Sequence, residues 1–140
     1  MCNENEWIVR EAFLAYDRGD VDRMMDFVDP DLEWTHLDPG LGNSQLRTDH
    51  GRRELENALR RQLDLGLRAE VEEVIAAGQH VMLVMRTPGV LVMRTPGVDE
   101  YRNQQDDDRT YDVATVRDGL IVELRACRDR GEARSLAGIG

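Results

Sequence analysis

The segment RTYDVATVRDGLIVELRACR, residues 109–128, is the most informative part of this chain about its fold. Apolar and polar residues alternate on both sides of Asp118-Gly119, and Asp-Gly between two alternating runs is the strongest short-range signal for a β-hairpin. The pattern therefore predicts two antiparallel strands, over 109–116 and 120–128. Asp129 and Glu132 follow with the spacing of a helix capping box, which predicts a last helical turn.

The chain before this hairpin changes from helical to strand periodicity near Gly66. Apolar spacing of three and four predicts helices over about 5–18, 21–27 and 51–66, with Asp20 as a cap and Gly19 as a stop. Alternation then predicts strands over 67–75 and 80–86. A further strand is predicted over 32–37, followed by a loop over 38–50 that is rich in Gly, Asn, Ser and Asp.

This order of elements, helices first and a strand meander last, is typical of an α+β domain. At 140 residues the chain fits one domain, residues 1–140. The expected architecture is a curved antiparallel sheet with three N-terminal helices covering one face. Such an arrangement leaves a conical cavity open at the ends of the strands.

The bulk composition excludes several classes of function. The net charge of −10 repels phosphate backbones and anionic membrane surfaces, so we expect no nucleic-acid or membrane partner. No apolar run is long enough to span a membrane, and the acidic N-terminus is unlike a signal peptide, so a cytoplasmic location is predicted. Cys2 and Cys127 are predicted to be free thiols. His50 and His80 lack metal-site spacing, and no metal or cofactor is expected.

An identical octapeptide, LVMRTPGV, occurs twice in succession, at 83–90 and 91–98. Eight is an even number, so the duplication preserves side-chain alternation and either copy fits the same strand. Pro88 lacks an amide hydrogen and is disfavoured inside a central strand. We therefore predict that the duplication forms a loop or projecting hairpin outside the core.

Six short segments occur in order along nearly the whole chain: IVREAF (8–13), RGDVD (18–22), DPDLEW (29–34), GRR (51–53), RDGLIV (117–122) and RDRGEA (128–133). Together they resemble SnoaL-like proteins of the nuclear transport factor 2 superfamily. The resemblance implies a cone-shaped fold, a pocket inside the cone and a homodimer through the outer face of the sheet. Relatives include ketosteroid isomerases, polyketide cyclases, dehydratases, epoxide hydrolases and proteins without catalysis, so residues must decide the chemistry.

The strand predicted over 32–37 carries the first candidate site. Trp34 and His36, with Asp38 directly after the strand, lie two residues apart and share one face. By the resemblance, His36 falls where ketosteroid isomerases carry their proton-shuttling aspartate. An imidazole beside a carboxylate is a credible general base with an orienting partner. The alternative is structural, with His36 capping the sheet and Asp38 starting the loop.

Asp112, on the first strand of the hairpin, is the second candidate. By the resemblance it aligns with the protonated aspartate that donates a hydrogen bond to the oxyanion in ketosteroid isomerases. Ala114 and Val116 share its face, and with Leu124 on the next strand they are predicted to line the pocket. The alternative is an edge aspartate paired with an arginine.

Tyr16 lies one turn beyond Ala12, which occupies the position of the isomerases' oxyanion tyrosine. Tyr16 is predicted either to reach the pocket or to pack in the core. The leading hypothesis is a small-molecule protein that binds a hydrophobic or polycyclic compound and carries out cofactor-free acid–base chemistry. The rival hypothesis is a dimeric binding or accessory module with no turnover. A homodimer is predicted through an apolar outer face made of Tyr111, Val113, Thr115, Ile121 and Cys127.

Overall fold

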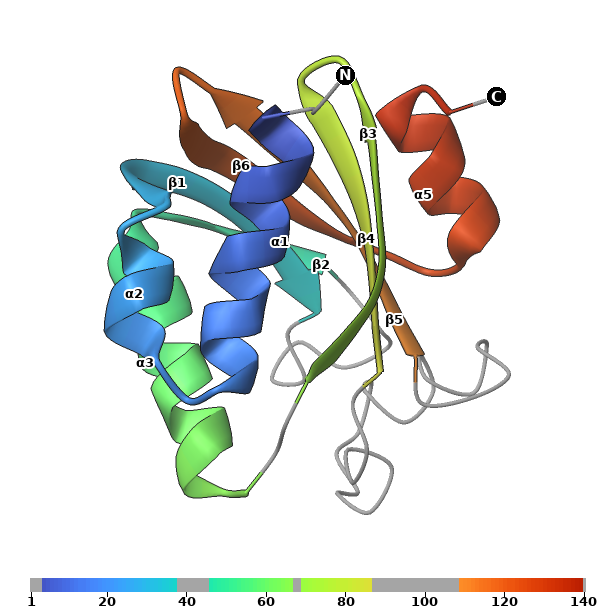
Figure 1. Cartoon of the computed structure of the whole chain (residues 1–140). Helices are drawn as coiled ribbons and strands as arrows, with labels where there is room; N and C mark the ends of the chain where they lie inside the picture. The colour runs from blue at the N-terminus through green and yellow to red at the C-terminus, as the bar shows by residue number, and fades with distance from the viewer. Residues whose placement is uncertain (1–3, 38–45, 67–68, 87–108, 140) are drawn as a thin grey trace.

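A computed structural model of the chain describes residues 4–37, 46–66, 69–86 and 109–139 (Figure 1). Six strands form one curved sheet in the order β2-β1-β6-β5-β4-β3. No helix within these ranges is long and apolar enough to cross a membrane. The elements are α1 (Glu4–Asp17), α2 (Val21–Met25), β1 (Val28–Leu37), β2 (Leu46–His50), α3 (Arg52–Asp64), β3 (Glu70–Ala77), β4 (His80–Arg86), β5 (Arg109–Arg117), β6 (Leu120–Cys127) and α5 (Arg130–Ala137).

The predicted α+β class and the curved sheet are confirmed, with one correction to the strand directions. Four of the five strand pairings are antiparallel, but β1 runs parallel to β6, with Trp34 opposite Leu124. These two strands are far apart in the sequence, so no turn between them fixes their relative direction. The sheet is therefore mixed. The periodicity of the sequence does not contain the relative direction of two strands that lie far apart in the chain.

The hairpin predicted over residues 109–128 is confirmed. Asp118 and Gly119 have φ angles of 53° and 82°, the two positive values that a two-residue type I′ turn requires. Close to this turn the ladder shifts, because Thr115 pairs with Glu123 while Val116 pairs with Ile121. The extra residue in β6 is a β-bulge, and it reverses the alternation of side chains on either side of it.

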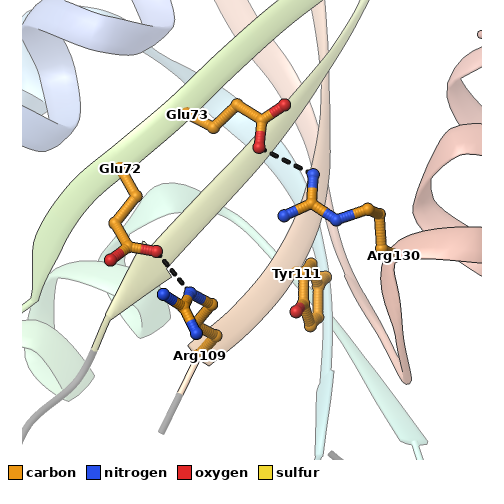
Figure 2. A pocket seen from close by; sticks show the side chains of 5 residues that line it. All are labelled: Glu72, Glu73, Arg109, Tyr111 and Arg130. Carbon is orange, nitrogen blue, oxygen red and sulfur yellow. Dashed lines mark hydrogen bonds and ion pairs between the residues drawn. The ribbon is translucent and has the colours of Figure 1, made fainter. Parts of the chain in front are cut away.

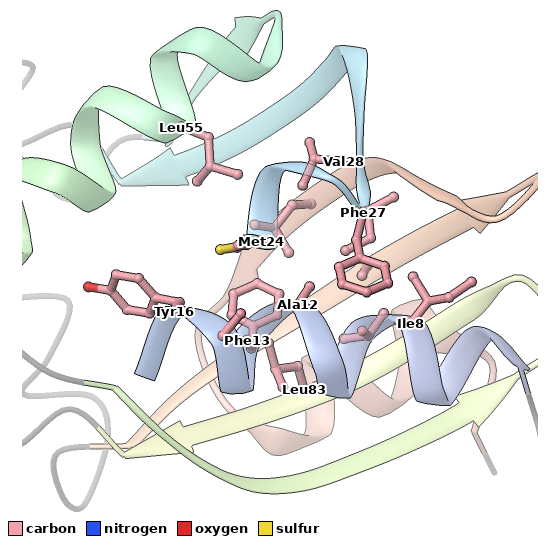
Figure 3. Packing of buried hydrophobic residues seen from close by; sticks show 14 of the residues in the cluster. Ile8, Ala12, Phe13, Tyr16, Met24, Phe27, Val28, Leu55 and Leu83 are labelled. Carbon is pink, nitrogen blue, oxygen red and sulfur yellow. The ribbon is translucent and has the colours of Figure 1, made fainter. Parts of the chain in front are cut away.

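The face of the sheet covered by α1, α2 and α3, here called the inner face, holds the main core (Figures 1 and 3). Helix α1 packs its apolar stripe, including Ala12 and Phe13, against strand residues such as Leu83. Burying a large aliphatic or aromatic side chain contributes about 1.5–3 kcal/mol. This layer therefore holds the helices to the strands and sets the position of every inner-face side chain.

The outer face carries a second, smaller core beneath α5 (Figure 1). Val113 and Cys127 lie there against Ala133 and Ala137 of that helix, and all four are buried. Burial, followed by the nearby Asp112 carboxylate, raises the pKa of the Cys127 thiol to about 12, so this cysteine stays protonated and unreactive.

This second core corrects the surface assigned to the homodimer. Ile121 lies in the inner core, because the bulge in β6 reverses its direction. Thr115 is buried, and its hydroxyl lies 3.0 Å from Nδ1 of His80. The apolar outer face is thus already covered in part by the chain's own helix.

Two further expectations differ from the structure. The loop predicted over 38–50 is wrong for its last five residues, which form β2, and the single turn after the hairpin is the complete helix α5. The predicted cap of that helix is confirmed, since Oδ1 of Asp129 accepts a hydrogen bond of 2.8 Å from the backbone N–H of Glu132.

The first octapeptide copy begins inside β4. Leu83 pairs with Val74 on one side and with Asp112 on the other, and the strand ends at Arg86. The first copy therefore supplies the end of this central strand. The rest of that copy and the whole second copy lie outside the described residues, as does the predicted loop or hairpin.

Candidate functional site

Four polar or aromatic side chains gather on the inner face where β1 pairs with β2. Trp34 and His36 alternate along β1, and the register places them opposite Asp49 and Arg47 of β2. Cross-strand partners in an antiparallel pair point to the same face, so all four side chains share it. We call Trp34, His36, Arg47 and Asp49 the inner cluster.

The two aromatic rings of the inner cluster are stacked. The centroids of the Trp34 indole and the His36 imidazole are 3.7 Å apart, and the ring planes are inclined by 18°. Trp34 also packs against the main core, which fixes the indole from behind. The predicted neighbourhood of Trp34 and His36 on one face is therefore observed, with the imidazole held against a rigid aromatic plate.

The acidic partner of His36 among the described residues is Asp49, which sequence reasoning did not identify. Nε2 of His36 lies 2.7 Å from Oδ2 of Asp49, and Nε of Arg47 donates a 3.0 Å hydrogen bond to Oδ1 of the same carboxylate. The predicted partner, Asp38, lies outside the described residues. Asp49 is recognised as the partner only from its position opposite β1. That position follows from the pairing of β1 with β2, which the sequence did not indicate.

Asp49 is the most buried ionisable group of the inner cluster, with 13% of its side chain exposed. The hydrogen bond with His36 lowers the pKa of this carboxyl below its usual value, and Arg47 lowers it further, while burial acts in the opposite direction. Asp49 is therefore ionised at neutral pH and accepts from both neighbours.

Asp112 lies on the inner face two strands away from His36. It pairs with Ala126 of β6 and with Leu83 of β4, which belongs to the main core. Because Trp34 and Thr35 are opposite Leu124 and Arg125, the parallel register brings His36 level with Ala126. Neighbouring strands are about 4.8 Å apart, so the His36 and Asp112 backbones are separated by roughly 10 Å.

His36, Ala126 and Asp112 lie level with one another across three strands and form a row that is only partly buried. All three keep partial exposure, whereas Leu124 and Ala114 in the adjacent row are buried. Leu83, which pairs with Asp112, is also buried, so His36, Ala126 and Asp112 form a partly accessible stretch beside fully covered core residues. In this stretch, an imidazole and a carboxyl group flank the small side chain of Ala126.

The other residues predicted to line a pocket lie inside the main core. Ala114, Val116 and Leu124 have 0%, 1% and 5% of their surface exposed, so they have little or no surface left for a ligand. Tyr16 is buried too, and its hydroxyl donates a 2.8 Å hydrogen bond to Oε1 of Gln62. Burial, followed by the charge of Asp17, raises the pKa of Tyr16 to about 12. Of the two predictions for Tyr16, the packing therefore favours the one that places it in the core.

A second polar site lies on the outer face, in a shallow hollow of about 560 Å³ between β3, β5 and α5 (Figure 2). A β-bulge at Glu72 brings two consecutive carboxylates to this side of the sheet. Glu72 pairs with Arg109 at 2.5 Å, and Glu73 pairs with Arg130 at 2.6 Å. We call the residues lining this space the outer hollow: Glu72, Glu73, Arg109, Tyr111 and Arg130.

The outer hollow is electrostatically balanced within itself. Each of its carboxylates has an arginine, and the guanidinium of Arg130 also lies over the Tyr111 ring, 5.6 Å from its centroid. Arginine does not lose its proton near neutral pH, so these pairs hold β3, β5 and α5 together but do not transfer protons. Among the described residues, no group of three His, Cys, Asp or Glu is arranged to hold a metal ion.

Comparison with known proteins places the chain in a defined family of folds. Residues 9–124 match the model of the SnoaL-like domain. None of the curated proteins matches the chain significantly.

Solved structures with the same fold extend over most of the chain. One is an NTF2-like protein of unknown function from Burkholderia pseudomallei, with 22% identity, a TM-score of 0.66, and coverage of 97% of this chain and 98% of that one. Another is Bal32a from a soil-derived mobile gene cassette, with 19% identity, a TM-score of 0.65, and coverage of 89% and 88%. A proposed polyketide cyclase from Sinorhizobium meliloti has 17% identity and a TM-score of 0.61, with coverage of 86% and 93%.

Proposed function

The chain belongs to the SnoaL-like domain family, and from that premise we propose that it binds a small hydrophobic molecule against the inner face and moves a proton on it. The observation that carries the proposal is the half-buried row in which His36 and Asp112 flank Ala126. Two titratable groups on one face, separated by a small apolar side chain, fit the two ends of an enolisable compound. The reaction class is cofactor-free isomerisation, cyclisation or dehydration.

The roles follow from the chemistry of each side chain. The neutral imidazole of His36 takes a proton from a carbon next to a carbonyl group, and the electron pair of the broken C–H bond becomes an enolate. Asp112 has the role of donating a hydrogen bond to the oxygen where the negative charge develops, and this role requires its carboxyl group to take up a proton when the compound binds. The imidazolium then returns its proton to the same or another carbon, so no other reactant is consumed. Trp34 lines this site beside His36.

The names of two structural neighbours are consistent with this class of reaction. The proteins from Sinorhizobium meliloti and from Xanthomonas campestris are described as proposed polyketide cyclases. Both are less than 20% identical to this chain, so they support the fold and leave the chemistry to the residues. The proposal therefore depends on His36 and Asp112.

The test uses a simple carbon acid in place of the unknown substrate. We expect the protein to accelerate exchange of the α-protons of 1-tetralone with D₂O at pH 7, followed by proton NMR. His36→Gln should lower the rate by about 100-fold or more, the usual contribution of a general base. Asp112→Asn keeps a hydrogen-bond donor and should lose less than Asp112→Ala. The matched control is Arg130→Gln in the outer hollow, which should leave the rate unchanged.

Two results separate catalysis from a binding module without turnover. Loss of exchange on replacing His36, with unchanged affinity for 1-tetralone, supports proton transfer. If wild type binds 1-tetralone on the inner face and exchange is no faster than in buffer, the chain is a binding module and the acid–base proposal is wrong.

The assembly belongs to the same proposal, which includes a homodimer. The apolar surface left for a dimer contact is smaller than the sequence indicated, because α5 already covers Val113 and Cys127. The outer hollow, with half-exposed Tyr111 among charged groups, is the part of the outer face that a second copy would meet. Light scattering at micromolar concentration should give twice the 16.0 kDa mass of the chain, and a 16.0 kDa particle would contradict the dimer.

A further inference from the structure

We propose that Arg47 binds an acidic group, so that the compound held against the inner face is a planar hydrophobic acid with its carboxylate at Arg47 and its rings at Trp34. This inference rests on the proposed function only for the place where the compound binds, because it concerns recognition and includes no proton-transfer step. Arg47 of β2 lies opposite His36 of β1, and both side chains are on the inner face. Arg47 therefore borders the same site.

The inner cluster exposes its guanidinium-bearing side chain and buries its carboxylate. The side chain of Asp49 is 13% exposed, whereas that of Arg47 is 53% exposed. Oδ1 of Asp49 accepts a hydrogen bond from Nε of Arg47, and Oδ2 lies 2.7 Å from Nε2 of His36. A compound that approaches this part of the inner face therefore meets Arg47 before it meets the carboxylate, and an acidic group is attracted there.

The contact with Asp49 also orients the guanidinium. The 3.0 Å hydrogen bond from Nε to Oδ1 ties the end of a long side chain to a residue of its own strand. A guanidinium carries five N–H donors in one plane, so it can serve more than one carboxylate at a time. Because more than half of the Arg47 side chain is exposed, a compound on this face reaches it in the presence of its other contacts. Arg47 is thus a charged group with a defined position.

Trp34 accounts for the hydrophobic part of the proposed compound. Its indole packs against the main core, stacks on the His36 ring at 3.7 Å between centroids, and stays partly exposed. Trp34 is opposite Asp49, so Arg47 is its diagonal neighbour across the strand pair. Diagonal neighbours are about 7–8 Å apart, which a two-ring aromatic acid can span. The spacing of an aromatic plate and a guanidinium therefore fits an aromatic acid.

The overall charge of the chain acts against an acid, so a preference for one must come from a local contact. At a net charge of −10 the protein repels anions at long range. Salt screens this repulsion beyond about 10 Å at 0.1 M ionic strength, whereas a charge-assisted hydrogen bond acts at contact. The test therefore compares an acid with a neutral compound of the same shape.

The first measurement uses 2-naphthoate and 2-naphthamide at pH 7. Binding is followed by the indole N–H resonance of Trp34 in ¹⁵N-labelled protein, assigned by its loss in Trp34→Phe. Trp7 of α1, which is 52% exposed, is the internal reference. The wild type should bind the carboxylate with an affinity about 10-fold higher than the amide, or more, as hydrogen bonds to charged groups provide. Arg47→Gln should abolish this preference and leave the affinity for the amide unchanged.

The matched control is Arg125→Gln on the outer face. Arg125 of β6 is exposed and pairs with Val113, which lies in the core under α5. Its replacement changes the net charge by the same amount as Arg47→Gln and should keep the preference for 2-naphthoate. An equal loss of preference in both variants would assign it to the overall field and overturn the role of Arg47.

The second measurement needs no variant and decides the case in which Arg47→Gln does not fold. Phenylglyoxal modifies exposed arginines, and mass spectrometry of peptides gives the rate at each position. Saturating 2-naphthoate should slow modification of Arg47 by about 10-fold or more, as expected for the affinity gain from a charged contact, and leave Arg125 unaffected. Modification of Arg47 at the same rate with and without 2-naphthoate would overturn the inference.

The results separate this inference from the proposed function. If both probes bind the wild type with equal affinity, acid recognition by Arg47 is wrong, while binding at the inner face stands. If the acid preference depends on Arg47 but exchange of 1-tetralone is no faster than in buffer, this inference stands and the proposed proton transfer fails. If neither probe shifts the Trp34 resonance, this inference is wrong, and the exchange assay alone decides the proposed function.

Discussion

The inner cluster and the outer hollow are both built from charged side chains that meet across strands, yet they are organised differently. In the inner cluster one carboxylate, Asp49, is shared by His36 and Arg47 and is only 13% exposed. In the outer hollow each of two carboxylates has an arginine, and the four side chains are 31–43% exposed. The first arrangement contains an imidazole stacked on an indole, and the second consists of two carboxylate–arginine pairs beside a tyrosine ring.

This difference shows why the outer hollow is the weaker candidate for proton transfer. Each of its carboxylates is paired with an arginine, so the role of these ion pairs is to connect β3, β5 and α5. The groups of the inner cluster are ordered by hydrogen bonds and stacking. Four changes test the contrast between the two faces.

The largest effect is expected from neighbouring residues of β4 that point to opposite faces. Leu83 lies in the main core and Val84 in the core under α5. Leu83→Ala should lower the free energy of unfolding by about 2–5 kcal/mol, and Val84→Ala by about 2 kcal/mol because fewer carbons are removed. Urea unfolding measures both. Leu91→Ala, in the same octapeptide context, is the control, and a loss as large as that of Leu83→Ala would show that both copies contribute to the core.

The second effect is the pH dependence that the inner cluster gives to stability. The folded-state pKa of Asp49 is lowered, so its contribution is present above the ordinary value of 3.8 and is lost as the pH falls through the lower folded value. His36→Gln removes the main cause of this shift. It should lower stability at pH 7 by about 1–2 kcal/mol and flatten the decrease below pH 4. Parallel acid profiles for wild type and variant would contradict this account.

A smaller effect is expected when an ion pair of the outer hollow is broken. Arg130→Gln removes the contact with Glu73. Both side chains are more than one-third exposed. Exposed pairs contribute little, so we expect a loss of about 0.5 kcal/mol that disappears in 1 M salt. Thermal unfolding at two salt concentrations measures it. A loss above about 2 kcal/mol would mean that this pair anchors α5 far more strongly than its exposure suggests.

The smallest effect is expected from deleting residues 91–98. The first copy of the octapeptide already supplies the end of β4, and a shorter connection closes at lower entropic cost. Stability should stay the same or rise by less than about 1 kcal/mol in urea unfolding. A deletion variant that does not fold, or that changes its oligomeric state, would place the second copy in the core or at an interface.

Local features of this fold could be predicted from the sequence because short-range chemistry determines them. The turn at Asp118-Gly119, the helix cap at Asp20 and the cap at Asp129 each depend on residues within three positions. Non-local pairing could not be predicted. β2 is a short, mostly exposed edge strand without apolar alternation, so residues 46–50 had the composition of a loop. Asp49 was missed for the same reason.

The candidate site was predicted in part, for a related physical reason. Trp34 and His36 share a face because alternation along an unbroken strand segment is reliable. Alternation was misleading for Ile121, where a one-residue bulge in β6 exchanged the faces. Ala114, Val116 and Leu124 lie on the inner face as alternation predicted. Their burial depends on which part of the inner face the helices cover. The spacing of residues within the strands does not carry that information.

The bulge in β3 has a consequence for how this protein behaves at high concentration. β3 is an edge strand of the sheet, and an edge strand with a regular ladder is a template on which another molecule can add a strand. Here the ladder is interrupted at Glu72, and Glu70 and Glu73 add charge along the same edge. An incoming strand would meet an irregular backbone and several carboxylates. The residues that build the outer hollow thus also protect the sheet from edge-to-edge aggregation.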